Sequence, residues 1–485
     1  MHSLSAIFRN RVAERPLPPA VTVAPDAACA DAVRRMREAR ASAAIVVAPD
    51  GSPVGIVTEQ DIVRRAAFAV PPDAPVATIM SAPVETIRSD ATLYEAIARM
   101  RRLELRHMPV VQHGKVIGLL PLDQAYGTSI GRMLDLIDRL SHDSSVDGLR
   151  HVKAAQVGLA EALFAENVPA PEIQALLSDI NGDIYRRILR LTAAELAAAG
   201  RGPAPVDYSV LIMGSGGRGE SFLFPDQDNG FILDDYPDAE HDRIDGWFIA
   251  LAERMTSLLD AVGIPLCKGY VMAVNPLWRK TRPQWRAQMQ AWMRQRYGAS
   301  ARFADIFFDF RSVYGNPGFA DELRAHVTPL VAGHRAFLRD MYDLQAEHDV
   351  ALGWLGRFRT ETRAGPDRGR LNLKYGGTLP LVEGVRLLAL AEAIPATSTV
   401  ERLRGLAAKG ALPADRLGDL LAAFDILTAV LLRQQMLDFR AGRPVGNYVQ
   451  LAALPARERR LLREAMRAIR AFRLELRGRM TEGVL

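Results

Sequence analysis

The chain has 485 residues, of which 49% are hydrophobic and 24% charged, and its formal net charge is +5. This composition is typical of globular proteins and excludes a disordered or fibrous chain. At about 150 residues per domain, the length predicts roughly three domains. No apolar stretch approaches the ~18 uncharged residues of a membrane span, and the N-terminus lacks the apolar core of a secretory signal. The two cysteines, Cys29 and Cys267, predict a reduced, cytoplasmic protein without a disulfide framework.

The positive charge is a weak indication of nucleic-acid binding. Only six of the 61 basic residues are lysines, and such an excess of arginine over lysine is typical of a GC-rich genome. The local basic excess over residues 357–485 favours solvated helix faces over a polyanion-binding surface. Nucleic acid is therefore not expected as a partner.

Residues 21–61 and 85–123 form an internal repeat. Four pairs match at an offset of 64 residues: Asp26 with Asp90, Ala32 with Ala96, Met36 with Met100 and Val46 with Val110. Each copy has the pattern of a helix, a short apolar strand, a glycine turn and a second strand. A unit this small leaves one apolar face uncovered, so we expect the two copies to pack on each other.

This repeat resembles a tandem pair of CBS domains over residues 18–126. The resemblance implies a module that binds adenine nucleotides and regulates the attached protein, with Thr58 facing phosphate and Asp61 facing the ribose hydroxyls. Helix N-termini do favour phosphate. The spacing of these two residues also fits a capping box, which would serve only to begin the helix. In the second copy Pro121 replaces the hydroxyl residue, so a nucleotide site is less expected there.

The segment after the repeat, residues 127–200, carries helical periodicity. It ends at Gly200, and the break RGPAPVD follows. We expect a helical connector here, and no residue in it points to chemistry.

The motif that carries chemistry begins after the apolar stretch 208–213, which predicts a buried strand. The glycine-rich turn GSGGRGE at 214–220 follows directly, and Asp226 and Asp228 open the next predicted strand. Glycines allow backbone N–H groups to approach phosphate oxygens. Two aspartates that are two positions apart on a strand direct both carboxylates to one face. Such a pair facing a triphosphate suits Mg²⁺.

Together, the strand, the turn and the Asp-x-Asp pair resemble the signature of the nucleotidyltransferase superfamily. The version in this chain is similar to PII uridylyltransferase and glutamine-synthetase adenylyltransferase, and to a bacterial family of signal-transduction nucleotidyltransferases that follow CBS pairs. The resemblance spans residues 18–480. It implies an NTP substrate whose nucleoside monophosphate passes to an acceptor, and it includes protein side chains among the acceptors. A glycine turn beside an unrelated acidic pair on the surface would give the same local pattern.

A third carboxylate is usual in the superfamily on a neighbouring strand. The strand that we expect at 267–275 contains no acid, so Asp309 is the next candidate. Asp309 either completes the catalytic set or pairs with Arg311 and holds its element in place. Without a third acid the acceptor would lack its base, and the chain would then be a catalytically inactive scaffold that senses adenine nucleotides.

The C-terminal third, residues 331–485, is rich in helical patterns. Its stretch LNLKYGG at 371–377 is similar to the Leu-Lys-Gly-Gly stretch that follows the catalytic domain of the two transferases. Lys374 could therefore reach a phosphate, or it could be an exposed lysine before a helix. Arg218, in the turn, is placed with the nucleotide ligands or forms a supporting pair with Glu220.

The predicted fold class is multidomain α/β plus α. Its parts are a tandem CBS pair (18–126), a helical connector (127–200), a nucleotidyltransferase-type α/β domain with a mixed sheet (201–330) and a helical C-terminal domain (331–485). The predicted activity is Mg²⁺-dependent and CBS-regulated, in a homodimer with no membrane partner. The predicted catalytic residues are Asp226, Asp228 and Asp309, the first two of which also hold the metal. The predicted nucleotide ligands are Gly214, Ser215, Gly216, Arg218 and Lys374, with Thr58 and Asp61 at the CBS pair.

Overall fold

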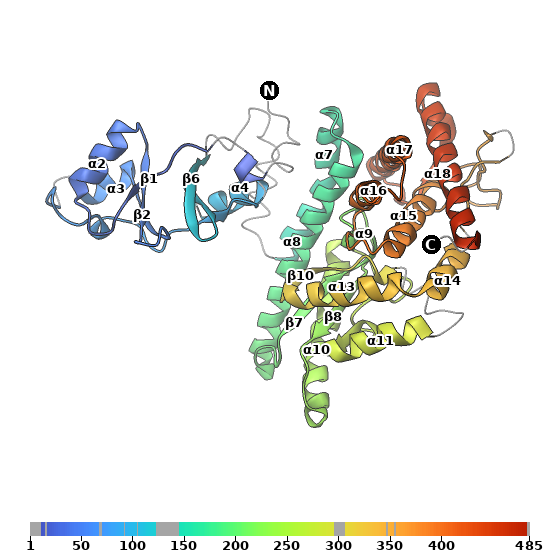
Figure 1. Cartoon of the computed structure of the whole chain (residues 1–485), viewed down its shortest axis with the longest axis horizontal. Helices are drawn as coiled ribbons and strands as arrows, with labels where there is room; N and C mark the ends of the chain where they lie inside the picture. The colour runs from blue at the N-terminus through green and yellow to red at the C-terminus, as the bar shows by residue number, and fades with distance from the viewer. Residues whose placement is uncertain are drawn as a thin grey trace. The chain divides into compact units, whose positions relative to one another are not determined.

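The computed structural model describes residues 11–14, 17–66, 70–91, 93–103, 105–122, 145–294, 306–345, 348–353 and 356–482. The chain divides into two compact units, residues 1–143 and 144–485 (Figure 1). The repeat lies in the first unit, and the glycine turn with its aspartates lies in the second.

The first unit contains two three-stranded sheets of the same topology. The first copy comprises β1 (Val21–Val23), α2 (Cys29–Glu38), β2 (Ala43–Val47), β3 (Pro53–Thr58) and the short helix α3 (Glu59–Asp61). The second copy comprises β4 (Ile87–Arg88), α4 (Leu93–Arg102), β5 (His107–Gln112) and β6 (Lys115–Pro121). In each sheet the first strand pairs in parallel with the second, which pairs antiparallel with the third. The predicted repeat is therefore confirmed.

The matched residues of the repeat are core positions. All six apolar members of the matched pairs have an exposed fraction of 4% or less: Ala32, Met36, Val46, Ala96, Met100 and Val110. The two copies also pack on each other, because Ala43 and Ile45 of β2 share an apolar cluster with Leu119 of β6. A hydrogen bond of 2.6 Å between Ser42 Oγ and His107 Nε2 adds a polar link.

The second unit is built around a four-stranded mixed sheet, as predicted. Its order is β10 (Arg311–Gly315), β7 (Tyr208–Ile212), β8 (Asn229–Leu233) and β9 (Arg279–Thr281). β7 is antiparallel to both β10 and β8, and β8 is parallel to β9. Every residue of the two central strands is buried, because helices cover both faces.

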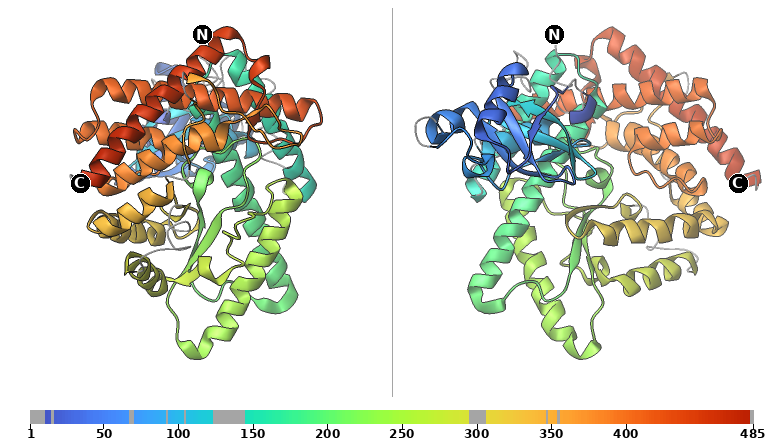
Figure 2. Two further views of the ribbon diagram at one scale, coloured as in Figure 1. Left: turned by 90° about the vertical axis from the view of Figure 1, so that its right-hand side faces the viewer. Right: turned by 60° about the vertical axis from the view of Figure 1, so that its left-hand side comes forward.

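One face of the sheet carries α8 (Ala170–Leu196) and α10 (His241–Val262), which lie side by side in both views of Figure 2. The rings of Tyr208 and Phe231 pack there on Phe248, with centroid distances of 5.2 and 6.3 Å. The opposite face, with Leu211 and Ile232, joins the core formed with α11 (Arg282–Arg294) and α13 (Pro317–Ala332). The alternation of a strand thus divides its apolar side chains between two helical layers.

The helices in the segment predicted as a connector belong to this second unit. α7 (Val146–Ala165) and α8 pack on α10, and α8 also packs on β10. The break near residue 200 therefore separates a helix from a strand within one compact unit, where the sequence predicted a boundary between domains. Residues 127–144 of the segment lie outside the described residues.

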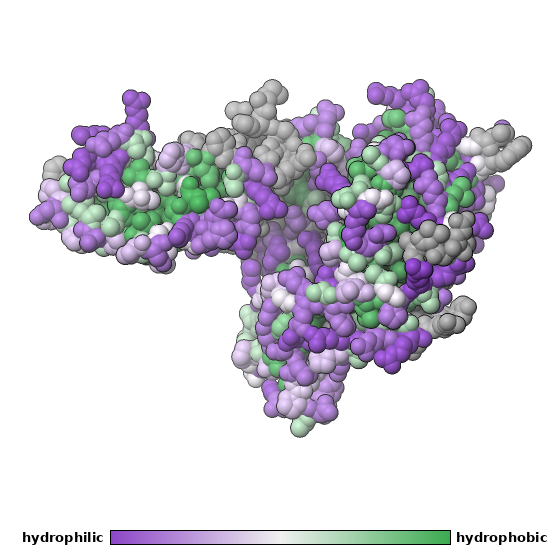
Figure 3. Space-filling model, viewed as in Figure 1, coloured by the Kyte–Doolittle hydropathy of each residue, from purple (hydrophilic) through white to green (hydrophobic). Residues whose placement is uncertain are grey.

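The C-terminal part is helical, as predicted. It contains α14 (Arg335–Gln345), α15 (Leu379–Ala391), α16 (Thr399–Ala408), α17 (Ala414–Arg440) and α18 (Ala456–Glu482), with a two-stranded pairing of β11 (Leu371–Asn372) and β12 (Tyr448–Val449). Among the described residues, α17 alone is long and apolar enough to cross a membrane, but 67% of its apolar window is buried inside the molecule. Hydrophilic residues cover most of the second unit on the face shown in Figure 3. α17 is accordingly a core helix.

Candidate functional site

The glycine-rich turn folds as a single helical turn, α9 (Gly214–Gly217), directly after β7. Gly214 has a φ of +55°, and a Cβ at this position would lie 2.5 Å from Oδ2 of Asp228. A Cβ on Gly217 would lie 1.8 Å from the main-chain oxygen of Asp309. Glycine is therefore required at both positions, because the turn packs directly against the aspartate loop on one side and the segment of Asp309 on the other.

The first amides of this turn are available to a ligand. No hydrogen bond joins the N–H groups of Gly214, Ser215 and Gly216 to an acceptor among the described residues, whereas each amide of residues 217–220 donates to a main-chain carbonyl. Gly214 and Ser215 also line the large cavity described below. These amides thus belong to residues that line the cavity, and their role as a phosphate cradle stays a prediction.

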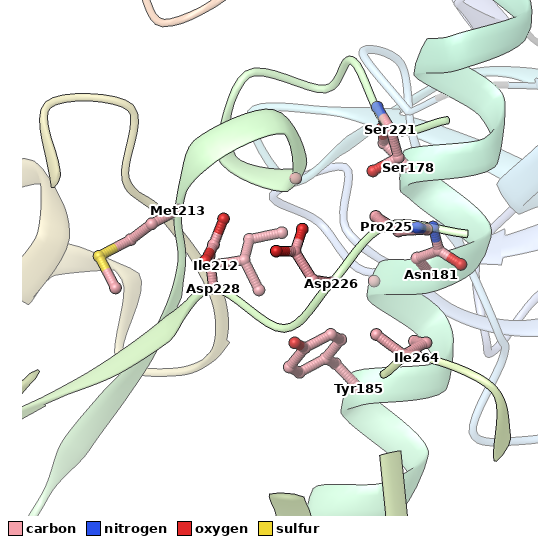
Figure 4. Close-up of a pocket in the computed structure, with 12 residues that line it drawn as sticks. Ser178, Asn181, Tyr185, Ile212, Met213, Ser221, Pro225, Asp226, Asp228 and Ile264 are labelled. Carbon is pink, nitrogen blue, oxygen red and sulfur yellow. Dashed lines mark hydrogen bonds between the residues drawn. The ribbon is translucent and has the colours of Figure 1, made fainter. Parts of the chain in front are cut away.

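Asp226 and Asp228 lie in the loop just before β8, one element earlier than the sequence predicted. Their carboxylates still converge, because an oxygen of each lies within 4.8 Å of the other and of Cys267 Sγ. Figure 4 shows Asp226 between Asp228 and the side chains of α8. The intervening Gln227 is fully buried and donates to the carbonyls of Thr256 and Ile264. Because the side chain of Gln227 is held in the interior by these hydrogen bonds, Asp226 and Asp228 on either side of it point to the other face of the loop.

The third member of this group comes from an irregular segment. The strand predicted at 267–275 does not form; this segment contains turns, and β9 takes its place beside β8. Gly269 and Pro276 in and after it are poor strand residues, which accounts for the difference. Burial and the charge of Asp228 raise the pKa of Cys267 to about 12, so its sulfur stays a thiol that hydrogen-bonds to Asp228.

Asp228 has the electrostatics of a cation ligand. Burial, followed by the neighbouring charge of Asp226, raises its pKa to about 7, although the thiol of Cys267 and the charge of Lys374 act in the opposite direction. Its Oδ1 is buried and has no hydrogen-bond partner in the described part of the chain. An unpartnered carboxylate oxygen beside a second carboxylate fits a hard divalent cation such as Mg²⁺. The neutral thiol suits Mg²⁺ poorly and acts instead as a hydrogen-bond donor to the carboxylate.

These residues face a cavity of about 640 Å³ between the glycine turn and the C-terminal helices, which we call the main cavity. Its volume lies in the usual range for small-molecule sites. The cations and anions that line it are Arg218, Asp226, Asp228, Lys268, Lys374, Glu383 and Arg386. Lys374 thus lines the same cavity as the aspartate pair, and its contact with phosphate stays a prediction. Gly216 instead lines a much smaller cavity, which the two aspartates also line. Figure 4 shows Asn181 and Tyr185 among the other side chains around it.

Asp309 does not join the two aspartates. Its side chain is completely buried, and its carboxylate lies 2.7 Å from each of three guanidinium groups, those of Arg218, Arg386 and Arg402. Burial alone would raise the pKa of Asp309, but these three charges outweigh it and hold the pKa well below its usual range. A carboxylate so held is a poor base, which corrects the predicted catalytic role. The predicted alternative partner, Arg311, instead approaches Asp179 at 3.7 Å.

Other contacts hold the turn and the aspartate loop in place. Arg218 pairs with Glu220 at 2.6 Å, as the sequence allowed, and Glu220 accepts a hydrogen bond from the amide of Thr399 on α16. Lys153 on α7, which the sequence analysis did not single out, is buried and donates to the side chain of Asn181 and the carbonyl of Leu223. Its sequence context is an ordinary helix, so no local pattern distinguishes it.

In the first unit, Thr58 and Asp61 form the capping box that the sequence offered as an alternative. Thr58 Oγ1 accepts from the amide of Asp61 at 3.2 Å, and Asp61 Oδ2 accepts from the amide of Thr58 at 2.9 Å. The nucleotide role of this pair stays a prediction. In the second copy Pro121 ends β6, and Asp123, where the corresponding motif ends, lies outside the described residues.

Family models match three parts of the chain. "CBS domain" matches residues 12–67 and 76–124, "Putative nucleotidyltransferase DUF294" matches 154–299, and "Putative nucleotidyltransferase substrate binding domain" matches 335–480. The second match includes α8 and three strands of the sheet, β7, β8 and β9, in agreement with their packing in one unit.

Several similar proteins and solved structures carry CBS domains by name and cover about a quarter of this chain or less. The CBS domain-containing protein CBSCBSPB3 of Arabidopsis thaliana is 33% identical over 116 residues, which are 24% of this chain and 21% of the relative. The uncharacterized protein MK0525 of Methanopyrus kandleri is 31% identical over 105 residues, 21% of this chain and 54% of the relative. The chain thus spans about a fifth of the length of the plant relative.

Among solved structures, the CBS domain protein PAE2072 from Pyrobaculum aerophilum, complexed with AMP, is 26% identical with a TM-score of 0.24 and covers 26% of this chain and 97% of that chain. The CBS domain NE2398 is 27% identical with a TM-score of 0.22, covering 26% of this chain and 94% of that chain.

Proposed function

This chain belongs to the family in which a CBS pair precedes a nucleotidyltransferase domain and its substrate-binding domain, and from this we propose that it is a CBS-regulated, Mg²⁺-dependent nucleotidyltransferase. The reaction moves a nucleoside monophosphate from an NTP to an acceptor. The observation that carries the proposal is the convergence of Asp226 and Asp228, with the unpartnered Oδ1 of Asp228, on a cavity that the glycine turn and several cationic residues also line.

The aspartates, the glycine turn and Lys374, which all line the main cavity, each have a role in the proposed reaction. Asp226 and Asp228 would hold Mg²⁺, which supplies charge neutralisation to the phosphates when bound. The amides of Gly214 and Ser215 donate to phosphate oxygens. Lys374 lies near enough to Asp228 for its charge to lower that residue's pKa, so it can balance the charge of the departing pyrophosphate.

The CBS pair supplies the regulatory part of the proposal. An adenine nucleotide binds at the first copy, with Thr58 toward the phosphate and Asp61 toward the ribose. Binding there would replace part of the capping box, so the ligand competes with contacts that begin α3. The protein acts in the cytoplasm, as its two free, buried cysteines suggest, and it acts as a homodimer with a protein among its acceptors.

Transfer of radiolabel tests the activity. We expect wild-type protein, incubated with α-³²P-labelled NTPs, MgCl₂ and cell extract, to label a product, and Asp226→Asn or Asp228→Asn to abolish the labelling. Asp234→Asn is the matched control, since this aspartate lies at the other end of β8 in a half-exposed pair with Arg282. Equal labelling by wild type and both site variants would refute the proposal.

A second candidate, a catalytically inactive scaffold that senses adenine nucleotides, is favoured by one observation. The third side chain beside the aspartates is the thiol of Cys267, and Asp309 is held by arginines instead of facing the pair. For the scaffold, calorimetry would show AMP binding that Asp61→Ala weakens, while no NTP yields a labelled product.

A further inference from the structure

A second cavity adjoins the main cavity at His348. This outer cavity has a volume of about 290 Å³, and its polar lining includes Asp349, Arg359, Thr360 and Glu361. His348 and Tyr375 line both cavities, so they stand at the junction between them. A group bound in the outer cavity would therefore reach the main cavity past the imidazole of His348.

The imidazole is held by a buried carboxylate. Nδ1 of His348 lies 2.9 Å from Oε1 and 3.2 Å from Oε2 of Glu383, a residue of α15 with an exposed fraction of 3%. A carboxylate at Nδ1 places the proton of the neutral ring on that nitrogen, which makes Nε2 the basic one. It also stabilises the imidazolium that forms when Nε2 takes up a proton. This is the arrangement of a general base with an orienting acid.

The proposed transfer needs a base that the aspartates do not supply. Asp226 and Asp228 serve the cation, and the carboxylate of Asp309 is held by three arginines. An acceptor hydroxyl is a weak nucleophile until its proton is removed. We propose that His348, oriented by Glu383, is the general base for a hydroxyl acceptor, and that the outer cavity binds this acceptor. The proposal rests on the nucleotidyltransferase function.

The step balances without a further reactant. Nε2 of His348 takes the proton of the acceptor hydroxyl as its oxygen forms a bond to the α-phosphorus. The bond from the α-phosphorus to the bridging oxygen of the β-phosphate breaks, and pyrophosphate leaves with the electron pair. The products are a phosphodiester, pyrophosphate and an imidazolium paired with Glu383, which later releases its proton to solvent.

The lining of the outer cavity indicates the class of acceptor. Arg359 is paired with Asp349 at 2.5 Å and also donates to the carbonyl of Val350, so its charge is largely satisfied within the protein. Thr360 and Glu361 add further polar groups. A cavity with acids and a neutralised arginine suits a neutral polar group with hydroxyls better than a phosphate or an apolar ligand.

Glycerol serves as the probe acceptor in the test. Full-length protein is incubated with ATP or UTP, MgCl₂ and glycerol, and both pyrophosphate and the nucleoside monophosphate ester of glycerol are measured. We expect His348→Asn to lower kcat at least 100-fold and Glu383→Gln to lower it about 10-fold, with the Kd for nucleotide unchanged within twofold. Added imidazole should raise the kcat of His348→Gly at least 10-fold. A purely structural role of His348 would not allow this rescue. His334→Asn, an exposed histidine outside both cavities, is the control.

The acceptor site has a separate readout. Thr360→Arg, which fills the outer cavity, should raise the KM for glycerol at least fivefold without changing the Kd for nucleotide; an unchanged KM overturns that half of the proposal. If wild type and His348→Asn transfer at the same rate, the base assignment is overturned while the nucleotidyltransferase function stands. If wild type labels a product in cell extract but transfers nothing to glycerol, the assignment of the outer cavity to a hydroxyl acceptor is overturned while the nucleotidyltransferase function stands. If wild type transfers nothing in either assay, both proposals fall.

Discussion

Replacing Asp309 with asparagine tests whether its arginine cluster is structural. The variant keeps the shape of the side chain and removes the charge that faces three guanidinium groups at 2.7 Å: those of Arg218, Arg386 and Arg402. Glu220 would then be the remaining acid of the cluster. Removing one partner of a buried ion pair costs about 3–5 kcal/mol, whereas an exposed pair contributes about 0–1 kcal/mol. We therefore expect the free energy of unfolding to fall by about 3–5 kcal/mol.

Urea unfolding at pH 7, followed by circular dichroism, measures this difference. Glu195→Gln is the control, because it breaks a half-exposed pair with Arg254 in the same unit and should cost less than about 1 kcal/mol. The arginines hold the pKa of Asp309 below that of an unfolded carboxyl. The stabilisation that Asp309 provides is therefore fully present above a pH of about 4 and is lost as the pH falls below that value. The difference in unfolding free energy between wild type and Asp309→Asn should accordingly shrink in acid. A variant as stable as wild type at pH 7 that has lost transfer activity would refute the structural role.

Three further substitutions test the site. In EDTA at pH 8, Asp228→Asn should raise the free energy of unfolding, measured by calorimetry, by up to about 4 kcal/mol, because burial raises the pKa of this carboxyl to about 7 and disfavours its charged form. The gain should fade between pH 7 and 4, and a loss of stability would contradict this reasoning. Lys153→Met removes the donor to the carbonyl of Leu223. We expect it to lower the free energy of unfolding in urea by about 1–3 kcal/mol and to slow the transfer of radiolabel. Unchanged stability would argue against Lys153 as an anchor. Gly217→Ala should lower the free energy of unfolding by at least about 2 kcal/mol, because its Cβ would lie 1.8 Å from a main-chain oxygen. Gly216→Ala is the control: its Cβ would have its nearest contact at 3.9 Å, and it should lower the free energy of unfolding by less than about 1 kcal/mol. Equal stability of the two variants would contradict the packing argument.

The sequence predicted those features whose causes lie within one or two elements. The strand β7, the turn after it and the aspartates before β8 are separated by a few residues, so their order alone indicates a shared site. The CBS repeat was likewise visible because the buried positions Ala32 and Ala96 recur at a fixed offset. Even here the local geometry differed, since the aspartates converge through the anchor of Gln227 and not through the alternation of a strand.

The environment of Asp309 and the role proposed for His348 could not be predicted, because the partners of these residues lie far along the chain. Arg386 is 77 residues from Asp309, and Glu383 is 35 residues from His348. Both partners lie on α15, whose sequence reads as an ordinary apolar helix. Whether an acid or a histidine has a structural or a catalytic role depends on the charged groups that folding places beside it. The spacing of residues in the sequence does not indicate these distant neighbours.

The arginine cluster also has a consequence for the main cavity. It contains three guanidinium groups and two carboxylates, those of Asp309 and Glu220. Arg218 and Arg386 belong to the cluster and also line the cavity. The buried carboxylate of Asp309 therefore fixes two guanidinium groups beside the space proposed for the triphosphate, where a cation attracts an anion strongly because the surroundings are poorly solvated. Without Asp309 the arginines would repel one another, so Asp309 supports the proposed activity by holding them at the wall of the cavity.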